Sequence, residues 1–74
     1  MTRAEVLQAF DELVELPPGT LTGNEKLEDL ENWNSMAMIG FIALADSNNG
    51  VKLSPRGLAS AETVNELLAL AKVE

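Results

Sequence analysis

The hydrophobic positions of the first segment recur at the intervals of an α-helix. Thr2 and Glu5 have the spacing of a capping box, in which each side chain satisfies a backbone N–H group of the other residue. The acidic residues of the segment, Asp11 included, fall largely off the apolar face, and Pro17 ends the predicted helix. That face is formed by Val6, Leu7, Phe10, Leu13 and Val14.

Residues 17–34 have the composition of a loop that is fixed to the core. Thr20, Gly23 and Asn24 favour turns, whereas three leucines at positions 21, 27 and 30 are expected to hold the connection in place. A long connection in a compact domain is functional or disordered, and the leucines favour an ordered loop. The acidic residues at positions 25, 28, 29 and 31 indicate a solvated face, with a docking patch for a basic partner as the alternative.

A second helix is expected to begin at Asn34 or Ser35, because both residues are good N-caps. The run 36–45 carries no charge and is apolar nearly all round, which indicates burial on several sides or an exposed apolar face. Gly40 costs about 1 kcal/mol relative to alanine, and it either permits a close approach or is a tolerated weakness. The run 47–50 provides the C-terminal stop, with Gly50 suited to a positive φ.

Two further helices are expected after Val51 and Leu53, which should fill the core. Ser54 and Pro55 predict a short helix of about one turn that ends near residue 59. A last helix is predicted from about residue 61 to residue 73 with Ser60 as its cap. The expected fold is therefore all-α: a single domain, residues 1–74, forming a small bundle of three longer helices and one short helix with a long first loop. The inner face of the last helix is expected to contain Val64, Leu67, Leu68 and Ala71.

Composition excludes several chemistries. The 74 residues include 5 basic and 12 acidic side chains, a net charge of −7, and neither His nor Cys. A thiol nucleophile, an imidazole base and a His- or Cys-based metal site are thus excluded, and we expect a protein that is not an enzyme and holds no metal. The negative charge disfavours nucleic acid and favours partners with basic surfaces.

The same sequence predicts a cytoplasmic protein. The longest apolar run, 36–45, is half of the roughly 20 residues that a membrane-spanning helix needs, so no membrane insertion is expected. Residues 1–5 lack the basic and then apolar pattern of an export signal. A monomer is expected, with dimerisation through an apolar second helix as the alternative.

Ser35 is the one residue that suggests a specific chemistry. It can cap the second helix, or it can carry a phosphate ester, because the N–H groups and partial positive charge of a helix N-terminus suit an anionic group. The segment Leu-Glu-Asn-Trp-Asn-Ser-Met-Ala-Met-Ile at 30–39 resembles the Asp-Ser-Leu attachment region of acyl carrier proteins, in particular stand-alone members that read Trp-Asp-Ser-Leu or Trp-Asp-Ser-Met. The landmarks Leu53-Ser54-Pro55 and Thr63-Val64 also fall in register, so the resemblance covers most of the chain.

The resemblance implies a carrier whose sulfur comes from a prosthetic group. Members of this family carry 4′-phosphopantetheine on the serine, transferred from coenzyme A by a phosphopantetheinyl transferase, and here that residue is Ser35. The thiol of the arm holds acyl groups as thioesters and presents them to synthases, acyl ligases or acyltransferases. Core helices of the family can shelter an acyl chain. The candidate walls of such a cavity, for each of which plain core packing is the favoured interpretation, are Phe10, Met38, Ile39, Ile42, Leu53, Val64 and Leu68.

Two departures from the family pattern change the expectation. Asn34 replaces an aspartate that helps to hold the magnesium ion of the transferase, and this leaves two outcomes open: slower modification, or an asparagine whose oxygen is a sufficient substitute. The second helix also lacks the acidic residues that meet basic partners of fatty-acid synthesis, which indicates a specialised lipid, envelope or secondary-metabolite pathway. A more hydrophobic recognition surface is expected from Asn34, Met36, Ala37, Gly40, Phe41 and Leu44.

Two interpretations stay open beside the acyl carrier. A peptidyl or aminoacyl carrier would differ only in its cargo, and an unmodified helical protein-interaction module would carry no prosthetic group.

Trp33 is expected to pack on the loop leucines, with contact to the arm or to a partner as the alternative.

Overall fold

The computed structural model describes residues 2–73, so Met1 and Glu74, the ends of the expected domain, lie outside the described residues. Four helices occur in this range: α1 (Arg3–Leu13), α2 (Ser35–Asn49), α3 (Pro55–Ala59) and α4 (Val64–Leu70). A 3₁₀ turn, η1 (Leu27–Asp29), lies in the long connection between α1 and α2. The predicted all-α bundle with its long first loop is confirmed.

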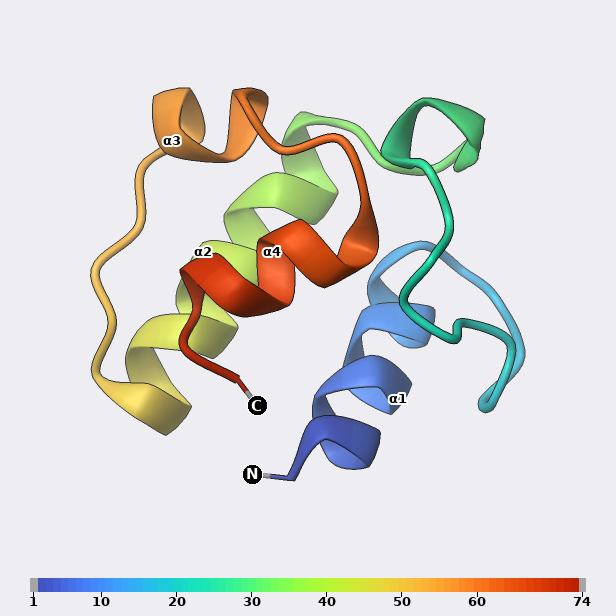
Figure 1. The fold of residues 1–74 in the computed structure, drawn as a ribbon, viewed down its shortest axis with the longest axis horizontal. Coiled ribbons are helices and arrows are strands. Elements are labelled where there is room, and N and C mark those ends of the chain that lie inside the picture. Colours follow the sequence, from blue (N-terminus) through green and yellow to red (C-terminus); the bar gives the residue numbers. More distant parts are fainter. Residues whose placement is uncertain (1, 74) are drawn as a thin grey trace.

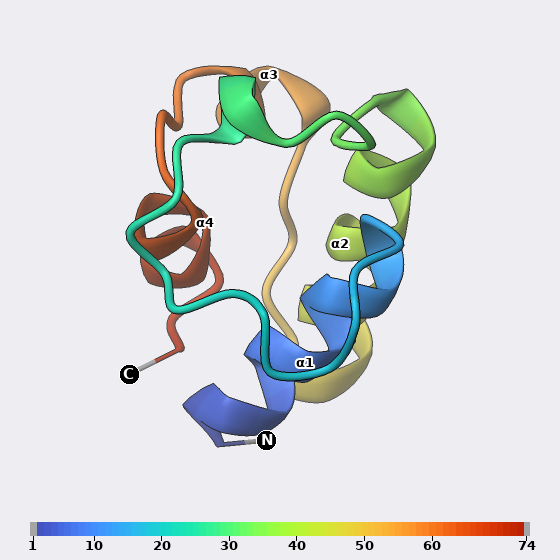
Figure 2. The same ribbon diagram turned by 90° about the vertical axis from the view of Figure 1, so that its right-hand side faces the viewer.

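The helices surround one apolar core. Figures 1 and 2 show α1, α2 and α4 around a common centre, with α3 at the end of the molecule where α2 begins. Phe10 of α1 and Phe41 of α2 are both fully buried, and their rings meet edge to face with centroids 5.6 Å apart. The inner face predicted for the last helix is confirmed, because Val64, Leu67, Leu68 and Ala71 are all buried.

The capping box of α1 is present as predicted, but one acidic residue of this helix is not on its solvent face. The hydroxyl of Thr2 accepts the N–H of Glu5 at 3.2 Å, and the carboxylate of Glu5 accepts the N–H of Thr2 at 2.9 Å. Asp11 is completely buried, contrary to the prediction. Its carboxylate accepts the N–H groups of Gly19 at 2.9 Å and Leu21 at 3.0 Å, which supply partners that solvent would otherwise provide.

The long connection is ordered by its leucines, as expected. Leu21 and Leu27 are buried, and Leu30 is half-buried. Gly23 has a φ of 116° and is also buried; a Cβ atom there would collide with side-chain atoms of Asn65 and Arg3. A residue with a side chain therefore does not fit where the loop passes α4.

The last helix begins later than predicted. Thr63, not Ser60, is its N-cap, and Glu66 completes a second capping box. The preceding residues are extended, because they pair with the first loop: Leu27 donates its N–H to the carbonyl of Glu62 at 2.8 Å, and Lys26 and Thr63 form an isolated antiparallel bridge. This pairing with the first loop takes the place of the first turn that the sequence predicted for the last helix. Ser60 instead ends α3.

Candidate functional site

Ser35 is the first residue of α2, and its side chain is not the cap of that helix. The N-cap is Asn34, whose side-chain oxygen accepts the N–H of Ala37 at 3.1 Å, while its backbone carbonyl accepts the N–H of Met38 at 2.9 Å. Ser35 is exposed. The capping role is filled by its neighbour, so the Ser35 hydroxyl is available for other chemistry.

The cap also determines what Asn34 can offer to a ligand. An amide side chain has one oxygen, and here one of the two lone pairs of that oxygen accepts the N–H of Ala37. The remaining group of Asn34 is the Nδ2 amide, which donates hydrogen bonds and does not bind cations. An aspartate in this position would retain a second oxygen after capping.

The structure corrects the predicted recognition surface of α2. Ala37 and Phe41 are buried in the core, at 4% and 0% exposure, and cannot meet a partner. Leu44 is half-buried against the core cluster. An uncharged helix has no polar face by which to orient it, so the sequence did not indicate that these residues face the core.

Of the apolar side chains predicted for this surface, Met36 is exposed, and α2 also exposes two residues that were not predicted to lie there. Met36 is 77% exposed and Ile39 is 60% exposed, and Ala43 lies beyond them on the same side of the helix. We call Met36, Ile39 and Ala43 the exposed face of α2. It begins directly beside Ser35, and Ile39 was wrongly expected to line an interior cavity.

Gly40 lies at the edge of α2 that faces α1. A Cβ atom on Gly40 would come within 2.5 Å of Cδ2 of Leu13, so the glycine permits the close approach of this side chain. The shallow groove beside it has a volume of about 440 Å³. It is lined by Ala9, Glu12, Leu13, Gly40, Ala43, Leu44 and Ser47.

The residues expected to shelter an acyl chain mostly form packed core. Phe10, Val64 and Leu68 have no exposed surface, while Met38, Ile42 and Leu53 pack partly buried against the same cluster. The described hollows of this protein are lined by other residues. The structure therefore presents these positions as a filled core.

Trp33 stacks on an aromatic ring of α1, a contact that was not predicted. Its ring stacks on Phe10 with centroids 5.3 Å apart and an interplanar angle of 20°. The residue before it, Asn32, donates its side-chain amide to the carbonyl of Val14 at 3.3 Å. Both contacts tie the segment that precedes Ser35 to α1, and sequence reasoning missed them because they join residues far apart in the chain.

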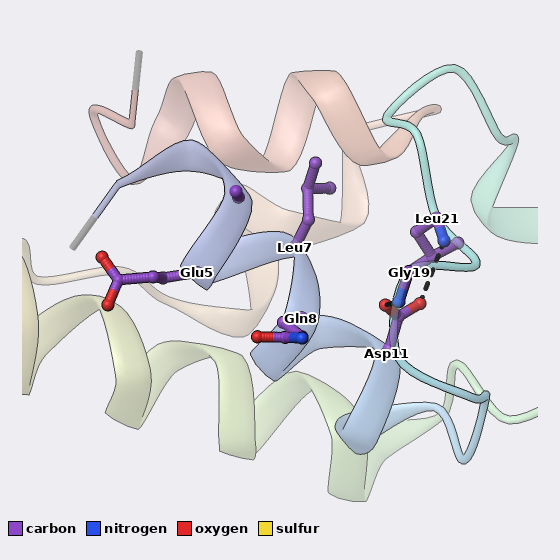
Figure 3. Close-up of a pocket in the computed structure, with 7 residues that line it drawn as sticks. Glu5, Leu7, Gln8, Asp11, Gly19 and Leu21 are labelled. Atoms are coloured by element: carbon purple, nitrogen blue, oxygen red, sulfur yellow. Dashed lines mark hydrogen bonds between the residues drawn. The ribbon is translucent and has the colours of Figure 1, made fainter.

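A second hollow, beside α1, is lined by polar groups, but the hydrogen-bond acceptors of its buried carboxylate are already in use. It has a volume of about 270 Å³ and includes Glu5, Gln8 and Asp11 among its lining residues (Figure 3). Both carboxylate oxygens of Asp11 already accept backbone N–H groups of the loop. The carboxylate thus has a structural role here.

Three carboxylates among residues 2–73 have a lowered pKa, and each of them accepts backbone hydrogen bonds. N–H groups of Glu62 and Thr63 lower the pKa of Glu66, and the N–H group of Thr2 lowers that of Glu5. Burial tends to raise the pKa of Glu25, but hydrogen bonds from Thr22 and Gly23 outweigh it and lower the pKa. These groups hold caps and turns, which explains their shifts without a catalytic role.

The acidic loop divides into two parts. Glu28, Asp29 and Glu31 are exposed, in agreement with a solvated face. Glu25 instead turns inward to the N–H groups of Thr22, at 2.9 Å, and Gly23, at 2.8 Å. At the far end of α2, Asp46 forms an exposed salt bridge with Lys52 at 2.9 Å.

Ser35 is exposed at the N-terminus of α2, a position that can accommodate an anionic group. Its hydroxyl is on the surface, and the first-turn N–H groups of a helix have no intrahelical acceptor, so they can face an anionic group.

Within residues 2–73, no three acidic or histidine side chains gather where they could hold a metal ion. No helix in this range has both the length and the apolar character needed to cross a membrane. Comparison of the chain with protein-family models, curated proteins and solved structures gave no significant match.

Proposed function

We propose that this protein is an acyl carrier, in which Ser35 holds a 4′-phosphopantetheine arm whose thiol carries acyl groups as thioesters. The observation that carries the proposal is the exposed serine at the first position of α2, with the capping role filled by Asn34. A serine that does not cap its helix leaves its hydroxyl free for esterification. The residues around it supply the resemblance to acyl carrier proteins described above.

Attachment requires a hydroxyl that an enzyme can reach. In the transfer step, Oγ of Ser35 forms the new bond to phosphorus, the phosphoanhydride bond of coenzyme A breaks, and the nucleotide portion leaves. The proton of the hydroxyl passes to a base of the phosphopantetheinyl transferase. This protein contains no His, and its proposed role is that of a substrate and carrier.

The exposed face of α2 is the proposed docking surface for partner enzymes. Met36 and Ile39 expose apolar side chains directly beside the attachment point. A synthase, acyl ligase or acyltransferase that reaches the arm must contact this region, and the absence of charge between positions 35 and 45 makes that contact chiefly hydrophobic. The exposed acidic residues at 28, 29 and 31 can steer basic partners at longer range. Such recognition fits a specialised lipid, envelope or secondary-metabolite pathway.

Intact mass after modification tests the proposal. The protein is incubated with coenzyme A, magnesium and a broad-range transferase, and the wild type is expected to gain the mass of one phosphopantetheinyl group. Ser35→Ala should gain nothing, whereas Ser47→Ala, which removes an exposed serine at the other end of α2, should gain the same mass as wild type. A wild type that stays unmodified with several transferases contradicts the proposal, and modification of Ser35→Ala contradicts the site.

An unmodified helical interaction module is the second candidate. The exposure of Met36 and Ile39 favours it, because such side chains also mark surfaces that bind another protein. Protein purified from its native cells distinguishes the two functions: the carrier has the prosthetic group, and the module has a bare Ser35. The cargo released by mild thioester cleavage separates an acyl carrier from a peptidyl or aminoacyl carrier.

A further inference from the structure

The segment directly before α2 is attached to α1 at two points. The ring of Trp33 stacks on Phe10 at 5.3 Å, and the side-chain amide of Asn32 donates to the carbonyl of Val14 at 3.3 Å. Val14 is the C-cap of α1, and the carbonyls at the end of a helix lack intrahelical donors. We call Asn32 and Trp33 the clamp.

One buried ring connects the clamp with the helix that it precedes. Phe10, which has no exposed surface, contacts Trp33 on one side and Phe41 on another, where the two rings meet at 66°. Trp33 lies before Ser35 in the chain, and Phe41 lies after it in α2. The same ring of α1 therefore contacts the chain on both sides of the attachment serine.

A directed bond distinguishes the clamp from general packing. Trp33 and Asn32 are both half-buried, so neither is needed to seal the centre of the core. The amide of Asn32 nevertheless lies within hydrogen-bonding distance of a particular carbonyl, and the indole lies nearly parallel to a particular ring. Together these contacts fix where the chain enters α2, because they restrain two successive residues of the entering segment.

We propose that the clamp is a positioning device that presents Ser35 to the transferase in a single arrangement. This inference rests on the proposed attachment of the arm to Ser35. Neither clamp residue needs to touch coenzyme A; each acts through the backbone that leads to Asn34 and Ser35. When only a fraction of molecules holds the competent arrangement, apparent affinity falls by that fraction while turnover in the bound state is retained.

Transfer kinetics test the positioning role. Trp33→Ala is expected to raise the KM of the transferase for this protein by about tenfold and to change kcat by less than about twofold. Asn32→Ala should raise KM to a smaller extent. Trp33→Phe should restore KM, because phenylalanine retains a ring that can stack on Phe10. Val73→Ala, which trims a half-buried residue after α4, is the control for general loss of packing and should leave KM unchanged.

Amide exchange of the unmodified protein provides a second measurement. The N–H groups of Ala37 and Met38 both donate to Asn34 and report whether the start of α2 is held in place. Their exchange should be faster in Trp33→Ala than in Trp33→Phe or Val73→Ala. Wild-type KM in Trp33→Ala, or an equal rise in Val73→Ala, overturns the inference. If no transferase modifies the wild type, the proposed function fails, and exchange that is unaffected by Trp33→Ala separately disproves the clamp.

Discussion

Asp11 joins α1 to the loop that follows it, and both oxygens of its carboxylate take part. They accept the N–H groups of Gly19 and Leu21, while the residue itself is completely buried. Asp11→Asn replaces one acceptor oxygen with an amide that donates, so one buried N–H group loses its partner. We expect the free energy of unfolding to fall by about 2 kcal/mol. Urea denaturation measures the change.

An exposed neighbour provides the comparison for this prediction. Glu12→Gln removes a charge from the same turn of α1, but Glu12 is exposed, and surface changes of this kind usually stay within about 0.5 kcal/mol. Equal stability of Asp11→Asn and Glu12→Gln would show that the loop does not depend on the buried carboxylate.

Asn34 is the residue at which the family resemblance and the structure can be tested together. Its oxygen caps α2, so an aspartate would keep this cap and gain a second oxygen. Asn34→Asp is expected to increase the rate of arm attachment, because the free oxygen can help to bind the magnesium ion of the transferase. The rate is measured from the intact mass of samples quenched at successive times. An unchanged rate would indicate that a capped asparagine is a sufficient substitute.

At the scale of the elements, patterns that are local in sequence were predictable. The capping box at Thr2, the proline start of α3 and the left-handed Gly50 that ends α2 each depend on a few neighbouring residues. The start of α4 was predicted too early, although Thr63 and Glu66 have the same capping-box spacing as the first helix. The residues before Thr63 are extended because they pair with the first loop, and no local pattern records this pairing.

The orientation of α2 could not be read from its sequence, because an uncharged helix has no polar side. Burial now assigns opposite roles to two residues of this helix: Phe41 is in the core, and Ile39 is on the exposed face. Phe41→Ala should cost about 3–5 kcal/mol, whereas Ile39→Ala should change stability by less than about 0.5 kcal/mol. Thermal and urea unfolding measure both variants. A large loss in Ile39→Ala would mean that the exposed face is needed for folding.

At the scale of the whole molecule, the candidate site was only partly predictable. The sequence identified Ser35 and the start of its helix, since both follow from residues that are adjacent in the chain. It did not identify the contacts of Trp33 and Asn32 with α1, which depend on how the long loop returns to the first helix. Fixing this loop requires the buried Asp11 and the leucines together, and their joint effect appears only in the folded chain.

The response of the whole fold to acid follows from its capping carboxylates. Glu66 accepts N–H groups of Glu62 and Thr63, and its pKa in the folded protein is lowered below its ordinary value. A lowered pKa means that its contribution to stability is present above the pKa of the unfolded chain, about 4.3, and is lost as the pH falls further. Glu66→Gln should therefore be less stable than wild type at pH 7, and this difference should shrink as the pH falls below about 4.

The general effect of removing a charge must be separated from the weaker capping hydrogen bonds of a neutral acceptor, because a net charge of −7 makes the loss of a carboxylate relieve repulsion. Glu28→Gln removes the same charge from an exposed position in η1, outside both capping boxes. Urea unfolding of wild type and both variants between pH 3 and pH 7 gives the comparison. The cap predicts that Glu66→Gln is the less stable variant at pH 7 and that the two variants converge in acid. A gap between them that persists unchanged to pH 3 would contradict the assignment, because it would not depend on ionisation of Glu66.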